Sequence, residues 1–373
     1  MRQAKGDDIV NRSKVFGGVN VIFMGDLCQL KPPKQVALYG RPVAKSKSKK
    51  DISKDEIKTL NGIVIWRQVV KVVELVKNCR HSGDPRFSEF LSRLRVGRCT
   101  AATSNLLTMD DYQYLQSRLL ANIHRQNPQE LETFKDAPFI VGTKKLRDLL
   151  NAEIIQSRAT RSNKEVHLYY SKDFCKRQQV TGGTAEYLWT LQSCHVRDSF
   201  GRLPLFEGMK VMVTENVAFD SKIVNGSEGT IRNIVYDVDE EGRRFPIVAY
   251  VHIEGIGFNI PGLEEDVVPI FPTRVSISSV TLNAVGLDGC TFTRLQLPLM
   301  PGYAFTDFKS QGKTLTKAIV DIVTARGQGA YVMLSRVTSL SGIAILRWFP
   351  PSCIYTRLPE DLRAELVRLN CAC

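Results

Sequence analysis

The sequence predicts an α/β fold that is interrupted by a small β-barrel. Two short, continuous apolar runs, Phe139–Val141 and Ala318–Val323, are typical of strands buried on both faces of a parallel sheet. Between them, residues 210–272 alternate with a period nearer two, and the turn pairs Asn225-Gly226 and Glu241-Gly242 separate the alternating runs. Alternation of this kind is the pattern of a small barrel. We therefore expect one β module inserted into an α/β domain.

Three further strands are predicted in the N-terminal part of the chain. The run Gly18–Asp26 is apolar up to its Gly-Asp pair, and the polar loop Leu27–Pro33 follows it. Loops at the carboxyl ends of parallel strands are where open α/β sheets place their ligands. The segments Ile63–Trp66 and Val69–Leu75 resume the strand-like pattern. We expect these runs to form strands, the first of them buried on both faces.

Two helices carry clear start signals. Asp84 is a good N-cap, Pro85 fits the first helical position, and Gly97 supplies a stop. The apolar residues between them fall at helical spacing: Phe87, Phe90, Leu91 and Leu94. Thr143 is the expected cap of a second helix, which runs through Ile154.

After Gln296 the sequence returns to an α/β pattern. A strand-like run covers residues 295–299, and a polar segment, Thr306–Gly312, precedes the apolar strand already described. A helix is predicted within residues 327–340, and a last strand at residues 343–346. The α/β domain therefore resumes on the far side of the barrel.

Composition bounds the class of protein. The chain has 373 residues, of which 43% are hydrophobic and 24% charged, so a mostly disordered chain is excluded. Its net charge of +13 favours a polyanionic partner, nucleic acid before membrane. The nine cysteines form no CxxC pair, and the five histidines do not stand at metal-ligand spacing around them. We expect a reduced intracellular protein without structural zinc, a membrane span or a secretory signal.

Two local motifs are rejected as nucleotide sites. Gly312-Lys313-Thr314 has the form of the end of a phosphate-binding P-loop, but position 307 is Asp rather than Gly, and the apolar strand lies downstream. No complete G-x-x-x-x-G-K-[ST] occurs in the sequence. Asp239-Glu240 follows a strand inside the alternating segment and is interpreted as a solvated hairpin end, not a magnesium site.

Two polar turns and two arginines have alternative explanations. The string Gly25–Leu30 is a weak signal by itself, because a polar turn after a core strand explains such a string most of the time. The segment Thr306–Gly312 offers more hydrogen-bond donors than a core connection needs, which suits phosphate oxygens, although a solvated helix start is the alternative. Arg80 and Arg336 each follow an apolar run; such arginines are usually surface charges, but together they are able to converge on a transferring phosphate.

The order of these strings resembles the Pif-type (petite integration frequency) DNA helicases of superfamily 1. FGGVNVIFMGDLCQLKPP is similar to their motif III, and VELVKNCRHSGDPRFSEFLSRLRVG to motif IV and the helix after it. GMKVMVTENV and VNGSEGTI are similar to the start of their inserted barrel. QLPLMPGYAFTDFKSQGKTL and GQGAYVMLSRVTSL are similar to motifs V and VI. The resemblance covers residues 15–350, and the ordered set is far more specific than any one string.

The resemblance implies a RecA-like, P-loop NTPase-type second helicase domain with an inserted small β-barrel, plus the tail of a first RecA-like domain. The remnant of the first domain, with motif III, would be residues 1–60. The second domain would comprise residues 61–204 and 296–373, and the barrel residues 205–295. The chain would begin after the point where the Walker A and Walker B motifs of the family have passed.

The resemblance also implies roles for individual residues. The catalytic residues would be Gln29, Arg80 and Arg336. The residues that contact the nucleotide cofactor would be Asp26, Gln29, Arg80, Gln311, Gly312 and Arg336. Those that bind nucleic acid would be Thr306, Lys309, Ser310, Gln311 and Thr314. Many relatives carry His where this sequence has Asp307-Phe308, so the resemblance assigns no role to that position.

The implied function is that of the C-terminal part of an ATP-dependent 5′→3′ DNA helicase in genome maintenance, recombination or repair. ATP and Mg²⁺ are expected for the full-length family, and the chain alone is expected to be inactive without the Walker motifs. Its partners would be single-stranded or forked DNA and the N-terminal helicase half, in the nucleus or alternatively the mitochondrion. The alternatives are a non-catalytic single-stranded nucleic-acid-binding module and a partner-interaction protein that uses the barrel alone.

Overall fold

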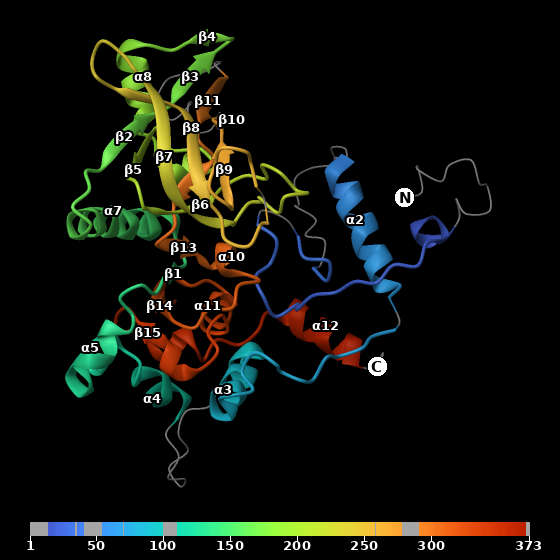
Figure 1. The fold of residues 1–373 in the computed structure, drawn as a ribbon. Helices are drawn as coiled ribbons and strands as arrows, with labels where there is room; N and C mark the ends of the chain where they lie inside the picture. Colours follow the sequence, from blue (N-terminus) through green and yellow to red (C-terminus); the bar gives the residue numbers. More distant parts are fainter. Residues whose placement is uncertain are drawn as a thin grey trace.

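A four-stranded parallel sheet forms the base of the molecule (Figure 1). The computed structural model describes residues 14–33, 36–40, 54–69, 71–99, 110–257, 259–277 and 291–370. The strands of this sheet lie in the order β13 (Ala304–Thr306), β1 (Phe139–Val141), β14 (Ala318–Asp321) and β15 (Ile343–Ile345). Val141 is in register with both Thr306 and Asp321, so the turns that follow these strands meet at one edge of the sheet. The α/β fold class predicted from the sequence is confirmed.

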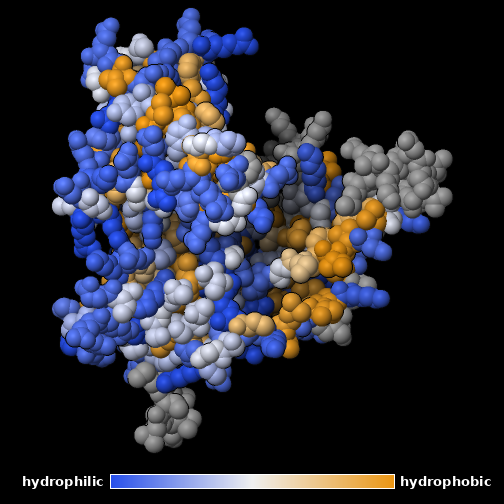
Figure 2. Space-filling view, in the orientation of Figure 1, coloured by the Kyte–Doolittle hydropathy of each residue, from blue (hydrophilic) through white to orange (hydrophobic). Residues whose placement is uncertain are grey.

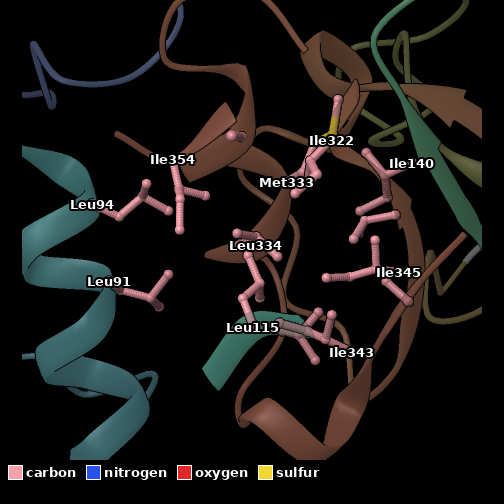
Figure 3. Close-up of a cluster of buried hydrophobic side chains, with 14 of the residues drawn as sticks. Leu91, Leu94, Leu115, Ile140, Ile322, Met333, Leu334, Ile343, Ile345 and Ile354 are labelled. Atoms are coloured by element: carbon pink, nitrogen blue, oxygen red, sulfur yellow. The ribbon is translucent and has the colours of Figure 1, made fainter. Parts of the chain in front are cut away.

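Helices and an apolar core hold this sheet. The helices are α3 (Pro85–Arg95), α4 (Asp111–Gln116), α5 (Leu120–Gln126), α6 (Pro128–Glu132), α7 (Lys144–Arg161), α10 (Asp307–Ser310), α11 (Gly329–Leu334) and α12 (Glu360–Asn370). Figure 3 shows Leu91 and Leu94 of α3 pointing toward Leu334 of α11 and Ile354, all of them in the core cluster. Because α3 packs on α11 in this way, the segments that flank these two helices lie close together.

The predicted helix signals are confirmed in α3. Asp84 Oδ1 accepts a hydrogen bond from the Phe87 backbone N–H at 3.0 Å, and Pro85 is the first residue of the helix. The other oxygen, Asp84 Oδ2, accepts from the Leu340 N–H at 3.0 Å. The cap therefore also ties the start of α3 to the chain beyond α11. In α7, Thr143 caps as predicted, and the helix runs past Ile154 to Arg161.

The β module is built on a seven-stranded, nearly closed sheet. Six of its strands follow the order β12 (Leu299–Pro301), β6 (Lys210–Val213), β7 (Glu228–Val238), β8 (Arg244–His252), β2 (His167–Tyr170) and β5 (Arg202–Leu205), and β9 (Val267–Ile270) pairs with β8. The predicted turns at Asn225-Gly226 and Glu241-Gly242 are present, and each glycine has a positive φ, 102° and 77°, which an L side chain rarely adopts.

A second, smaller sheet extends this module. Its strands are β10 (Thr273–Ser276), β11 (Phe292–Gln296), β3 (Lys172–Cys175) and β4 (Gln178–Gln179), and helix α8 (Gly182–Trp189) follows β4 in the chain. Strands β2 and β5 belong to the seven-stranded sheet, and β3 and β4 to the second sheet. Residues 167–205 therefore pack with the β module. The domain limits predicted at residues 60, 204 and 296 stay predictions, and part of the predicted barrel, residues 278–290, lies outside the described residues.

The strands predicted at residues 18–26, 63–66 and 69–75 are wrong. Residues 19–26 are extended but pair with no strand of the described chain, and Ile22 and Met24 are 87% and 88% exposed. Residues 63–66 belong to a helix, α2 (Lys54–Arg67), where Trp66 Nε1 donates to Glu365 Oε1 of α12 at 2.7 Å. A strand needs a neighbour for its backbone groups, and none of the described segments provides one here.

The segment after α2 has the same character. Val73, Leu75 and Val76 are 85–88% exposed, and residues 71–77 carry no strand pairing in the described part of the chain. Figure 2 shows apolar side chains gathered toward the right of the view, over the N-terminal segments. Contiguous exposed apolar surface of this kind marks an interaction site in a soluble protein.

Two smaller predictions also need correction. The run at residues 295–299 is divided between β11 and β12, and the helix predicted within residues 327–340 is limited to Gly329–Leu334. Over the described ranges no helix is long and apolar enough to span a bilayer.

We predict that Asp173→Asn destabilises the fold. Asp173 and Arg294 form a fully buried ion pair at 2.8 Å, and the mutation leaves a buried guanidinium without its carboxylate. The free energy of unfolding in urea should fall by about 3–5 kcal/mol. The control is Glu207→Gln, whose partner Lys164 is about half exposed at 3.4 Å and whose loss should cost less than about 1 kcal/mol. Equal losses for the two variants would contradict this account.

Candidate functional site

Two arginines meet where the chain beyond α11 passes the loop before α3. Arg336 is 2% exposed; its Nε donates to the Val332 carbonyl at 2.9 Å and its Nη2 to Ser335 Oγ at 2.8 Å. Arg80 donates from Nη1 to the Ser335 carbonyl at 3.0 Å and from Nε to Thr314 Oγ1 at 3.1 Å. Ser335 therefore holds both guanidinium groups, one through its hydroxyl and one through its backbone.

Neither guanidinium forms an ion pair with a carboxylate of the described chain; their partners are the hydroxyls and carbonyls named above. Burial lowers the pKa of Arg336, and the positive charge of Arg80 lowers it further. Two adjacent cations without a carboxylate are costly unless an anion completes the site. The geometry is therefore that of an anion-binding site.

Backbone contacts position this pair. The Leu315 N–H donates to the Arg336 carbonyl at 2.9 Å, and Leu315 pairs in parallel with Val337, so the segment after Gly312 is fixed beside Arg336. The ring of His81 donates a hydrogen bond from Nδ1 to Asn78 Oδ1 at 3.1 Å and packs edge-on against Phe87, with the ring centroids 5.4 Å apart. His81 is 5% exposed and therefore anchors the loop that carries Arg80. Sequence reasoning missed His81, although it adjoins Arg80.

Both carboxylate oxygens of Asp26, which lies near the arginine pair, accept hydrogen bonds. Its Oδ1 accepts from Arg95 Nη2 at 2.9 Å, and its Oδ2 from the Tyr331 hydroxyl at 3.4 Å. These bonds fasten the N-terminal segment to α3 and α11. Burial and the Asp26 charge raise the pKa of Tyr331 to about 12, so this hydroxyl keeps its proton and donates at neutral pH.

Gln29 lies in the same turn as Asp26. Its backbone N–H donates to the Asp26 carbonyl at 3.1 Å, and its side chain is half-buried. No side-chain hydrogen bond joins Gln29 to either arginine within the described residues. The structure thus brings Asp26, Arg80 and Arg336 into one region, while a role for Gln29 stays a prediction.

The residues of the polar segment 306–314 lie in different surroundings. Thr306 and Ser310 are buried, Thr314 contacts Arg80, and Lys309 contacts the barrel. Thr306 is 8% exposed and Ser310 fully buried, with Ser310 Oγ donating to the Asp307 carbonyl at 2.7 Å. Gln311 ends α10 through a 3.4 Å bond from its N–H to the Phe308 carbonyl, and Gly312 follows with a φ of 81°. Thr314, predicted to bind nucleic acid, has its hydroxyl on Arg80.

Lys309 faces the barrel instead. Its Nζ contacts Asn225 Oδ1 in the turn between β6 and β7. Burial lowers the pKa of Lys309, Asp198 opposes this shift, and the cations Lys144, Arg147 and Lys313 add to it. A cluster of cations at this junction suits a polyanion.

The residues present fit a nucleotide phosphate better than a metal ion. Neither arginine of the pair is ion-paired to a carboxylate of the described chain, although the nearby Asp26 charge acts on Arg336; the pair therefore fits a phosphate. Over the described residues, no group of three or more His, Cys, Asp or Glu side chains is placed to hold a metal, and Asp26 is already held by Arg95.

This arrangement, a parallel sheet with an inserted barrel, is the fold of a RecA-like domain. No family model matches the sequence. The chain is nevertheless similar in sequence to Pif-type DNA helicases. It is 27% identical over 344 residues to the human ATP-dependent DNA helicase PIF1, which covers 91% of this chain and 42% of that protein. It is 25% identical over 355 residues to PIF6 of Trypanosoma brucei brucei, covering 92% and 38% respectively.

Solved structures agree with the fold. The Pif1 helicase of Candida albicans has a TM-score of 0.55 at 20% identity, covering 96% of this chain and 70% of that one. The Bacteroides Pif1 helicase in complex with ADP-AlF3 and single-stranded DNA has a TM-score of 0.56 at 20% identity, covering 95% and 67%. The chain spans less than half the length of the curated relatives it matches.

We predict that Asp307→Asn stabilises the protein near neutral pH. Burial raises the pKa of Asp307 from 3.8 to about 6. The folded state therefore holds the proton more tightly than the unfolded chain, and its stability is highest below about pH 4 and falls as pH rises through about 6. The amide removes this loss, so the free energy of unfolding near pH 7 should rise by about 2 kcal/mol.

Urea unfolding of the wild type and Asp307→Asn between about pH 4 and 7 checks this prediction. The exposed Asp237→Asn on β7 is the control, and its stability should change by less than about 0.5 kcal/mol. Parallel pH profiles for the wild type and Asp307→Asn would contradict the assignment.

Proposed function

We propose that the chain is the C-terminal part of an ATP-dependent 5′→3′ DNA helicase, in which Arg80 and Arg336 act on the transferring γ-phosphoryl group of ATP. The observation that carries this proposal is the arginine pair, which has no carboxylate partner in the described chain. In phosphoryl transfer the protein contributes positioning and charge stabilisation rather than covalent chemistry. Two guanidinium groups fixed by Ser335 and Thr314 supply both.

The nucleotide site would be completed by groups outside the described residues. Asp26, Gln29, Gln311 and Gly312 would flank the nucleotide, with Gln29 sensing the γ-phosphate as the resemblance implies. Mg²⁺ would accompany ATP with ligands from the part of a helicase that carries the Walker motifs. Hydrolysis would then depend on closure of two domains, because the arginines and the P-loop come from different ones.

The exposed apolar segments suggest where that other part would dock. Residues 19–24 and 71–77 are extended, and Ile22, Met24, Val73 and Leu75 are among the most exposed apolar side chains described. Continuous apolar runs of this kind suit strands covered on both faces. We assign them to the sheet of the first RecA-like domain, whose remaining strands would cover them. For residues 71–77 this proposal departs from the domain limit predicted at residue 60.

Single-stranded or forked DNA is the proposed macromolecular substrate. Lys309 and its neighbouring cations would contact backbone phosphates, with Thr306, Ser310, Gln311 and Thr314 shaping the turn that presents them. Relatives of known structure include a Pif1 bound to single-stranded DNA and a Pif1 at forked DNA. We place the action of this chain on nuclear or mitochondrial DNA, in genome maintenance. A non-catalytic single-strand-binding module is the alternative that the experiments below separate.

We predict that Arg336→Ala abolishes hydrolysis when the chain is joined to a Walker-bearing first domain. DNA-stimulated ATP hydrolysis should fall by about 10³-fold or more, because a transition-state guanidinium is lost. Single-stranded DNA affinity should stay within about twofold. The chain alone should hydrolyse no ATP.

Arg326→Ala is the matched control. This exposed arginine lies just before helix α11, whereas Arg336 lies just after it. Arg336→Lys, compared by thermal unfolding, separates a folding defect from a catalytic one. Undiminished hydrolysis by a folded Arg336→Ala protein would refute the catalytic role, and DNA binding without stimulated hydrolysis by the joined wild type would favour the binding module.

We predict that the chain binds single-stranded DNA with strong salt dependence. The logarithm of the affinity should fall by about 0.7 per logarithmic unit of salt for each phosphate contact, and Lys309→Ala should reduce that slope by about 0.7. Fluorescence anisotropy with an oligothymidylate measures both quantities. Lys164→Ala, at an exposed lysine beside Glu207, should leave the slope unchanged. Binding that is insensitive to salt would contradict a phosphate-tracking interface.

A further inference from the structure

We propose that Lys313 is a second phosphate-binding cation for the single strand, and that Glu228 of the barrel occupies it until DNA arrives. This inference rests on the proposed function, because it extends the phosphate contact at Lys309. Neither Lys313 nor Glu228 belongs to the site that the sequence predicts.

Within the described residues, the side chain of Lys313 contacts the barrel and the adjacent strand β13. Its Nζ forms an ion pair with Glu228 Oε1, lies 3.3 Å from the Gly226 carbonyl, and sits 5.5 Å from the centroid of the Phe305 ring. Lys309, four residues earlier, contacts Asn225 Oδ1 of the same turn. Two lysines of the polar turn therefore meet one turn of the barrel.

The barrel turn presents a rigid set of oxygen atoms. The Gly226 N–H donates to the Val213 carbonyl at 2.9 Å, and the Asn225 N–H donates to Asn216 Oδ1 at 2.9 Å. With the backbone fixed in this way, the amide oxygen of Asn225, the carbonyl of Gly226 and the carboxylate of Glu228 face two ammonium groups. Phosphate oxygens make the same kind of contact, so the turn takes the place of a DNA backbone.

The ion pair between Glu228 and Lys313 lies near the surface, where another anion is able to displace Glu228. Its side chain is 52% exposed and that of Lys313 is 20% exposed, and ion pairs near the surface contribute little and are screened by salt. A second cation lies beside Lys313, because Lys309 contacts the same turn of the barrel. Two carboxylates nearby are already paired: Asp198 with Lys144 and Arg147 at 2.9 Å, and Asp148 with Arg147 at 2.6 Å. A phosphate therefore competes with Glu228 for Lys313.

Displacement would also release a contact between the two modules. Lys313 and Lys309 follow β13 of the parallel sheet, whereas Asn225 and Gly226 lie between β6 and β7 of the barrel and Glu228 is the first residue of β7. Binding of the strand would thus replace a bond between modules with a bond between each module and DNA.

The test compares variants of the full chain by anisotropy with an oligothymidylate at low salt. Glu228→Gln should bind about two- to fivefold more tightly, since it removes the competing charge but keeps the shape. Lys313→Ala should weaken binding and reduce the salt slope by about 0.7. In the double variant Glu228→Gln/Lys313→Ala the gain should disappear, because Glu228 acts through Lys313.

Glu264→Gln is the matched control. It makes the same charge change on the same module, at a side chain 73% exposed and 3.4 Å from Arg232, and it should leave affinity unchanged. An unchanged affinity of Glu228→Gln, an equal gain in Glu264→Gln, or a gain that persists without Lys313 would overturn the inference. If Lys309→Ala weakens binding while these variants do not differ from wild type, this inference alone fails. If the wild type binds no single-stranded DNA, the proposed function fails with it.

Discussion

The functional account depends on two positive charges held together with no ion-pair partner in the described part of the chain. Ser335 makes this possible, because one residue supplies a carbonyl to Arg80 and a hydroxyl to Arg336. Much of the surrounding structure serves to hold Ser335, Arg80 and Arg336 in place: α3 packs on α11, Asp84 ties its cap to Leu340, and Leu315 binds the Arg336 carbonyl. Repulsion between Arg80 and Arg336 destabilises the folded protein, and an anion that binds between them reduces this repulsion.

The arginine site and the lysine cluster are joined by one short turn. Thr314 places its hydroxyl on Arg80, while Lys313, the residue before it, places its ammonium on the barrel. Adjacent side chains thus contact the proposed nucleotide site and the proposed DNA path. Contiguity of this kind is a physical route for coupling, and a two-state change of the turn is what coupling would require.

The sequence predicted the parts of the fold that are specified locally. The helix at residues 85–95 was predictable from an N-cap, a proline and apolar spacing, and all three signals work as expected. The alternating barrel strands and the turns at Gly226 and Gly242 were predictable for the same reason. The runs at residues 18–26 and 69–75 were not, because an apolar run looks the same whether or not a neighbouring strand exists to pair with it. Residues 63–66 form a helix because Ile63 and Trp66 are buried, with Trp66 bonded to α12.

The candidate site was predictable in part. Arg80 and Arg336 were paired from sequence order and family resemblance, and the structure brings them together. The groups that hold them, Ser335 and Thr314, and the Asp26–Arg95 pair arise from contacts between residues far apart in the chain, which no local pattern records. The neighbours of Lys309 were unpredictable for the same reason, since Asn225 lies 84 positions away.

The most direct test of the central claim is anomalous diffraction from crystals of the chain soaked in tungstate, a heavy tetrahedral anion. The account predicts a tungsten peak between the Arg80 and Arg336 guanidinium groups, within hydrogen-bonding distance of both, and loss of that peak in Arg80→Ala. Tungsten found only at other cationic sites, with the space between these two arginines empty, would contradict it.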